Sequence, residues 1–279
     1  MKIIIFGVGF LGTKLMNLLS KKNEVIGTNI NPKSDLIKNL DATDKETVKE
    51  FLLKEKPQIV IDTIALTSSV ACEKNPELCK ELNYQTAKNI ADVCKEIGAK
   101  MIFISSSYVF EGKNGNYSEK DEPFATNEYA KTKILAEQEI SKLNDFLILR
   151  VDLMYGVENN KIKFGAGTFD REIIEVGFPN QLRSPLFIDD VPKVLDSLIE
   201  KDQKGFFHIA GPDRILMIDF LKKLAELENA RDKIKIVDSS NWLVKSPHDS
   251  SLDISKINSL GIQTTSFKDA FEILKESIK

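Results

Sequence analysis

The chain has 279 residues, of which 42% are hydrophobic and 29% are charged, a composition typical of a soluble globular protein with a sizeable core. Its 39 basic and 42 acidic side chains give a formal net charge of -3, which argues against nucleic acid as a partner. No stretch is long and apolar enough to cross a bilayer, so we expect a cytoplasmic protein with no membrane partner.

The cysteines and histidines exclude several kinds of site. Cys72, Cys79 and Cys94 form an odd number and follow no metal-ligand pattern. We therefore expect no disulfide framework, no metal and a reducing compartment. His208 and His248, the only histidines, lie far apart in the sequence, so neither a zinc site nor a histidine-based triad is expected.

The first half of the chain alternates short apolar runs with helix-like segments. Strands are expected at 2–7, 24–29, 58–64, 100–106 and 146–151. Helices are expected near 11–21, 44–55, 75–97 and 127–142. Such alternation indicates βαβ units with both faces of the sheet covered. The predicted fold is therefore α/β, a Rossmann-type doubly wound parallel sheet.

The alternation loosens after residue 151. A helix is expected at 168–176, a strand at 205–211, and helices near 216–229 and 266–277. We expect a dinucleotide-binding domain over 1–155, to which 185–210 returns. Residues 156–184 and 211–279 would then form a smaller substrate-binding lobe.

A glycine-rich turn follows the first expected strand. Gly7, Gly9 and Gly12 have G-x-G-x-x-G spacing between a strand and a helix, the context in which this motif binds a dinucleotide. Gly7 permits the tight turn, Gly9 leaves room for a pyrophosphate at the helix N-terminus, and Gly12 allows close packing. Phe10 and Leu11, inside the motif, are predicted cofactor contacts. The alternative is a glycine-rich turn without a ligand.

The end of the second strand bears on the choice of cofactor. An acid is expected there when the ribose hydroxyls of NAD are bound, but Asn29 occupies the place and Lys33 is near enough to meet a 2′-phosphate. NADP(H) is therefore favoured and NAD(H) remains the alternative. Asp41 and Ala42 are predicted to reach the adenine, although Asp41 also suits the start of a helix.

Tyr129 and Lys133 are four residues apart in "EYAKTK" and so share one face of a helix. A free tyrosine has a pKa near ~10, and a nearby ammonium would favour its phenolate. A serine hydroxyl opposite would hold a substrate carbonyl close to the phenol. Together these groups suit ketone reduction, with a hydride from one side and a proton from the tyrosine.

The sequence resembles the extended short-chain dehydrogenases/reductases, and most closely their dTDP-4-dehydrorhamnose reductase branch. The resemblance rests on "IIIFGVGFLG", "DTIALT", "ISSSYVFEG", "YSEKDEP", "EYAKTKILAEQEI", "LRVDLMYG" and "RSPLFIDD". It covers nearly the whole chain and is weaker after residue 160.

The resemblance assigns roles by position. It implies that Ser106, or else Ser105, binds the carbonyl, that Tyr129 is the catalytic acid, and that Lys133 tunes it and holds the nicotinamide ribose. Cofactor contacts are implied at Thr63, Ile64, Ala65 and Thr67. Substrate contacts are implied at Ser106, Ser107, Tyr108 and Arg183. Asn83 matches a helix asparagine found near such sites, and a partly exposed position is its alternative.

The departures from the branch fall on the substrate side. Ser106 and Ser107 replace Thr and Asp, Leu153 replaces a tryptophan, and Ser246 replaces an arginine. The implied function is NAD(P)H-dependent reduction of a nucleotide-linked 4-keto sugar. A sugar-nucleotide epimerase with retained NAD is one alternative. A regulatory subunit similar to the β subunit of methionine adenosyltransferase is another, and the family also allows a homodimer through 84–97 and 127–142.

Overall fold

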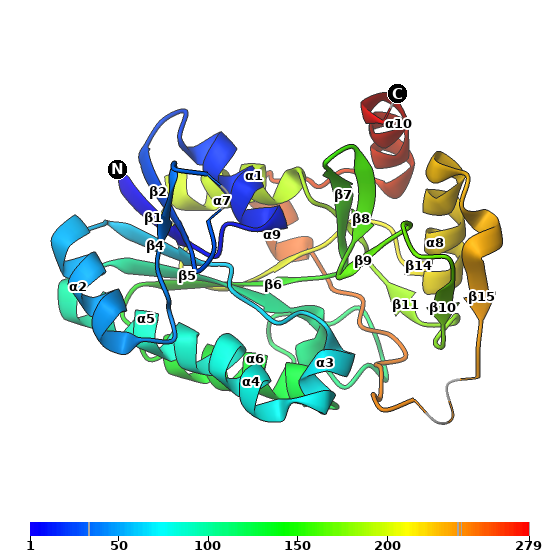
Figure 1. Ribbon diagram of the computed structural model, residues 1–279, viewed down its shortest axis with the longest axis horizontal. Coiled ribbons are helices and arrows are strands. Elements are labelled where there is room, and N and C mark those ends of the chain that lie inside the picture. The colour runs from blue at the N-terminus through cyan, green and yellow to red at the C-terminus, as the bar shows by residue number, and fades with distance from the viewer. Residues whose placement is uncertain (33, 239, 241, 279) are drawn as a thin grey trace.

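The computed structural model describes residues 1–32, 34–238, 240 and 242–278, and its centre is a parallel sheet in the order β13-β6-β5-β4-β1-β2-β3 (Figure 1). The strands are β1 Lys2–Phe6, β2 Glu24–Asn29, β3 Ile37–Asn39, β4 Ile59–Asp62, β5 Lys100–Ser106, β6 Phe146–Val151 and β13 Gly205–Ile209. Neighbouring strands of this sheet all run parallel. The predicted α/β fold class is confirmed.

Helices cover both faces of the sheet (Figure 1). One face packs against α1 Phe10–Leu19, α7 Asp190–Glu200 and α9 Ser255–Ser259. The other packs against α2 Lys45–Glu55, α5 Thr86–Ile97 and α6 Glu128–Ile140. Polar caps fix two of the starts: Asp44 accepts from backbone N–H groups at the start of α2, and Asn127 Oδ1 accepts from Ala130 N. The cap at Asn127 sets where Tyr129 sits on α6.

The single helix expected at 75–97 is divided. It consists of α4 Pro76–Lys80, a π-helical turn at Glu81–Gln85 and then α5, and a short helix α3 Ser69–Lys74 precedes it. Asn75 separates α3 from α4 and caps α4 by accepting from Leu78 N. Sequence periodicity is nearly the same through an α-helix and a single π turn, so the pattern did not reveal the division.

The later segments build small sheets and helices beside the main sheet (Figure 1). One sheet has the order β12-β7-β8-β9, and β10 pairs with β15 and β11 with β14. The strands are β7 Met154–Glu158, β8 Lys161–Phe164, β9 Gly167–Thr168, β10 Ile174–Val176, β11 Leu182–Arg183, β12 Leu186–Phe187, β14 Ile215–Leu216 and β15 Ile234–Ile236. The helices are α8 Met217–Ala225 and α10 Phe267–Ser277, with 3-10 turns at Ser107–Val109, Glu226–Glu228 and Arg231–Lys233.

The prediction of a helix at 168–176 is wrong. That stretch holds β9 and β10, and β10 is a strand because it pairs with β15, from Ile174 opposite Ile234 onward. A partner so distant in sequence leaves no local signal. The other late predictions hold, since 205–211, 216–229 and 266–277 contain β13, α8 and α10. Within the described ranges, no helix combines the length and apolarity that a membrane crossing requires.

Candidate functional site

A cavity of about 490 Å³ opens beside the glycine turn, at the carboxyl ends of β1, β2 and β4. Most of the predicted cofactor contacts line it: Gly7, Gly9, Asn29, Asp41, Ala42, Thr63, Ile64 and Ala65. In open α/β sheets this edge is where ligands bind. The structure therefore brings residues from four separate segments of the sequence to one ligand-sized space.

The geometry of the glycine turn suits a close-lying phosphate. Gly7 has a φ of +86°, and a Cβ there would lie 2.9 Å from Ile64 N. A Cβ at Gly12 would lie 2.6 Å from the carbonyl oxygen of Gly7, so this position must stay small for α1 to pack on the turn. At Gly9, by contrast, a Cβ would meet no atom of the described chain within 4 Å. The N-terminus of α1 is thus left accessible from the cavity.

The remaining predicted contacts lie outside the cavity lining. Leu11 is buried in the core against the sheet, and Gly12 lies beneath the turn. Phe10 packs under Lys163, whose Nζ is 4.7 Å from the ring centroid. Thr67 is exposed on the segment that leads to α3. Lys33, on which part of the preference for NADP(H) rests, falls outside the described residues.

Several lining residues were not predicted, namely Thr28, Ile30, Leu40, Thr43, Leu78, Glu81, Leu82 and Thr86. Those near Asn29 and Asp41 are sequence neighbours of predicted contacts. Those from Leu78 to Thr86 come from α4, the π-helical turn and the first residue of α5, and the motifs give no signal for them. Asn29 Nδ2 donates to the carbonyl oxygen of Val8, 3.2 Å away, and Asp41 Oδ1 accepts from Thr43 N at 2.9 Å. Both side chains therefore also hold the local backbone.

Ser106, Tyr129 and Lys133 come together at the end of β5, and all three are buried. Burial raises the pKa of Tyr129 to about 12, while a hydrogen bond with Ser106 and the charge of Arg183 act in the opposite direction. The Oγ of Ser106 also accepts from Tyr108 N at 3.2 Å. Ser106 rather than Ser105 bonds the phenol, because the Oγ of Ser105 donates to Glu137 Oε1, further along α6 than Tyr129.

Contrary to expectation, Lys133 does not lower the pKa of Tyr129. Its Nζ donates to the carbonyl oxygen of Ile104 at 2.8 Å and lies 4.3 Å from the centroid of the Phe103 ring. Burial lowers the pKa of Lys133 to about 8. Desolvation thus disfavours both charged forms and outweighs the attraction that spacing on the helix suggested.

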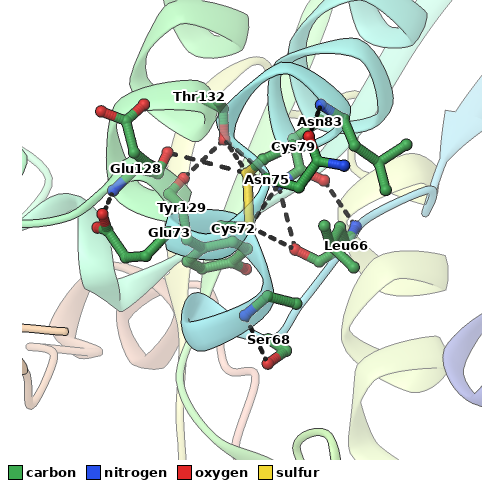
Figure 2. The surroundings of a disulfide bond; sticks show 12 residues. Leu66, Ser68, Cys72, Glu73, Asn75, Cys79, Asn83, Glu128, Tyr129 and Thr132 are labelled. Atoms are coloured by element: carbon green, nitrogen blue, oxygen red, sulfur yellow. Dashed lines mark hydrogen bonds between the residues drawn. A yellow bond between two sulfur atoms is a disulfide. The ribbon is translucent and has the colours of Figure 1, made fainter. Parts of the chain in front are cut away.

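Cys72 and Cys79 form a disulfide directly beside this site (Figure 2), contrary to the expectation of no disulfide framework. The cysteines are seven positions apart, but the bend at Asn75 between α3 and α4 brings their Cα atoms to 5.0 Å. Cys94 is free and buried. The cysteine count therefore gives no support for a reducing compartment.

Asn83 lies in the polar network around the disulfide and is fully buried, not partly exposed (Figure 2). Its Oδ1 accepts from Leu66 N at 2.7 Å, and its Nδ2 donates to Leu66 O at 3.2 Å. Nδ2 also donates to Thr132 Oγ1 at 3.3 Å. Asn83 therefore links the end of the cavity wall to α6, the helix that carries Tyr129.

The predicted substrate contacts are bonded to one another. Arg183 is buried, with 5% of its surface exposed. Its guanidinium pairs with Asp152 and donates to the hydroxyl of Tyr108 at 3.0 Å. The Oγ of Ser107 is buried and donates to Asp152 Oδ1 at 3.0 Å. The Tyr108 ring meets Tyr129 edge-on, and its hydroxyl lies 3.3 Å from Ser246 Oγ.

Comparison with known proteins agrees with this geometry. The family model of the RmlD substrate binding domain matches residues 1–278. The chain belongs to this family. The dTDP-4-dehydrorhamnose reductase of Bacillus anthracis, solved in complex with NADP, superposes with a TM-score of 0.85 and 25% identity over 98% of each chain.

Two curated relatives carry different functions. Methionine adenosyltransferase 2 subunit beta of Mus musculus is 29% identical over 99% of this chain and 87% of its own length. A probable low-salt glycan biosynthesis reductase of Haloferax volcanii is 30% identical over 78% of this chain and 77% of its own. The chain is an extended short-chain dehydrogenase/reductase, an oxidoreductase class that works with a nicotinamide cofactor.

Proposed function

We propose that this protein is an NADP(H)-dependent reductase of a nucleotide-linked 4-keto sugar. The observation that supports it most is the convergence of Ser106, Tyr129 and Lys133 at the end of β5, a strand away from the glycine-turn cavity. The Bacillus anthracis relative is named as a reductase of this substrate class, and the Haloferax volcanii relative as a reductase of glycan biosynthesis.

In this proposal the cavity residues hold the cofactor. The turn from Gly7 to Gly12 receives the pyrophosphate, Asn29, Asp41 and Ala42 the adenosine half, and 63–67 the nicotinamide half. Lys133 binds the nicotinamide ribose. A bound reduced nicotinamide supplies the hydride for the substrate carbonyl. NADP(H) is favoured because Asn29 replaces the acid that would repel a 2′-phosphate, and because the Bacillus anthracis relative was solved with NADP; NAD(H) is the alternative.

Side chains of the protein then donate the proton to the substrate. Ser106 donates to the carbonyl oxygen and holds it against Tyr129, and Tyr129 gives that oxygen its proton as the hydride arrives. The high pKa of Tyr129 keeps the phenol protonated at neutral pH, ready to act as an acid. Tyr108 and Arg183 would orient the nucleotide sugar, Arg183 through its bidentate guanidinium. The substrate lobe comprises 156–184 and 211–279 apart from α9, which packs against the main sheet. A cytoplasmic homodimer through α5 and α6 belongs to the same proposal.

The second candidate is a cofactor-binding regulatory subunit. It is favoured by the similarity to methionine adenosyltransferase 2 subunit beta across 99% of the chain. It is also favoured by the substrate side, where Arg183 is already paired with Asp152 and Tyr108 with Ser246. Such a subunit would bind the nicotinamide cofactor without turnover.

The test is a titration of the protein with NADPH and with NADH, followed by addition of a panel of nucleotide-linked 4-keto sugars. The proposal predicts tighter binding of NADPH and its oxidation by at least one sugar. Tight cofactor binding with no oxidation across the panel would favour the regulatory subunit. Interconversion of sugars without net oxidation would favour the epimerase.

A further inference from the structure

Asp62, the last residue of β4, is a buried carboxylate that neither the glycine turn nor the Ser-Tyr-Lys set employs. It is 1% exposed. Its Oδ1 accepts from Ile64 N at 2.9 Å, which holds the start of the cavity wall. Its Oδ2 has no hydrogen-bond partner among the residues that the structure describes. A buried, half-satisfied carboxylate is costly and calls for a compensating charge.

The compensating charge is Lys133. In the register of β4 and β5, Asp62 lies opposite Phe103, and both side chains point to the face covered by α5 and α6. The Nζ of Lys133, which is 2% exposed, reaches down from α6 onto the Phe103 ring. The carboxylate and the ammonium thus occupy one buried compartment. Burial raises the pKa of Asp62 to about 6 and lowers that of Lys133 to about 8, and each group opposes the shift in the other.

The other titratable groups around Lys133 are already engaged or neutral. On α6 itself, Glu137 accepts from Arg150 of β6, Nε at 3.0 Å and Nη2 at 2.7 Å, so its charge is compensated. On α5, burial raises the pKa of the Cys94 thiol to about 12, and on α6 the Tyr129 phenol is protonated at neutral pH. Of the groups that face Lys133 in the described chain, Asp62 is the carboxylate without a cationic partner of its own.

We propose that Asp62 is a positioning residue, the buried counter-ion that keeps Lys133 charged and its Nζ in place beside the site of hydride transfer. Its consequence for catalysis rests on the proposed function. The pair itself does not, because it follows from strand register, burial and the reach of Lys133.

Asp62→Asn tests the catalytic consequence, because the amide retains both the volume and an acceptor for Ile64 N. Loss of the negative charge makes the ammonium less stable, so Lys133 should release its proton at lower pH. The alkaline limb of kcat/KM should therefore move down by about one pH unit. Asp190→Asn is the matched control: Asp190 is also buried and accepts from Thr265 N and Oγ1, and it should leave the limb in place.

A thermal double-mutant cycle tests the pair without any turnover. Both groups are charged between about pH 6 and about pH 8, so the wild type, Asp62→Asn, Lys133→Met and the double variant are compared at pH 7. Lys133→Met alone leaves a buried unpaired carboxylate, and adding Asp62→Asn should restore about 3 °C of Tm. This recovery should shrink at pH 5, where Asp62 is protonated.

The outcomes separate the two proposals. Additive Tm losses at pH 7, or an alkaline limb that Asp62→Asn leaves unmoved in an active enzyme, would overturn the role of Asp62. If no sugar is reduced but the Tm losses are non-additive, the reductase proposal fails and the Asp62–Lys133 pair stands.

Discussion

The cofactor side and the substrate side of this site are built in different ways. On the cofactor side, the shape of the site is set mainly by the backbone. Gly9 leaves space at the start of α1, and Gly7 and Gly12 allow the turn and its packing. On the substrate side, Tyr108, Arg183 and Ser246 come from distant segments and bond to one another. The glycine turn depends on one short segment of backbone. The network on the substrate side depends on separate side chains, each of which can be substituted by itself.

The largest expected effect lies where the two sides meet. Tyr129→Phe removes the proton donor and should lower kcat by ~10²–10⁴-fold, while the affinity for NADPH, measured by fluorescence titration, stays unchanged. Tyr155→Phe is the control, because the Tyr155 hydroxyl is buried far from this chemistry and has no hydrogen-bond partner within the described ranges. Equal rates for wild type and Tyr129→Phe would remove the tyrosine from the mechanism.

Loss of a charged side chain should affect stability and substrate binding more on the substrate side than on the cofactor side. Arg183→Met leaves Asp152 buried and unpaired, and it should cost about 3 kcal/mol in the free energy of unfolding and raise KM for the sugar. Asp152→Asn in the same chain should recover part of the stability but not the KM, since the guanidinium is still missing. Chemical denaturation and steady-state kinetics measure the two quantities. Recovery of both would mean that Arg183 acts only as the partner of Asp152.

On the cofactor side, two glycine substitutions should affect cofactor binding and stability separately. Gly9→Val places a side chain in the space beside the turn, so it should weaken NADPH binding by at least about tenfold, the equivalent of ~1.4 kcal/mol, with little change in Tm. Gly12→Ala brings a Cβ against the Gly7 carbonyl and should instead lower Tm. If Gly9→Val bound NADPH as the wild type does, the pyrophosphate would not lie at this turn.

The same contrast explains what sequence could predict. The parallel sheet and the glycine turn follow from local patterns, because strand and helix periodicity fix where those elements lie. The choice of Ser106, with Ser105 as the alternative, came from the family resemblance. Two features depended on distant contacts instead: β10 needed β15 as its partner, and Arg183 needed Asp152. The Cys72–Cys79 disulfide depended on a local bend at Asn75 that the helical periodicity did not reveal. The raised pKa of Tyr129 was also missed, since burial cannot be judged from i,i+4 spacing.

The effect expected to be smallest near neutral pH concerns stability away from both sides. Burial lowers the pKa of His208 to about 3, below the value of ~6.5 in the unfolded chain. Its neutral form stabilises the fold above pH 6.5, and this contribution is lost as pH falls toward 3, by at most ~1.4 kcal/mol per pH unit. His208→Gln should flatten the fall of Tm with pH in this window. His248→Gln, at an exposed position, should not.

The most direct measurement follows the hydride itself. The protein is mixed with NADPH deuterated at the transferring position and a nucleotide-linked 4-keto sugar, and the product is examined by mass spectrometry and NMR. The reductase proposal predicts deuterium on the former carbonyl carbon, with one NADPH oxidised for each sugar reduced. Cofactor that stays bound and reduced while every sugar in the panel is recovered without deuterium would contradict it.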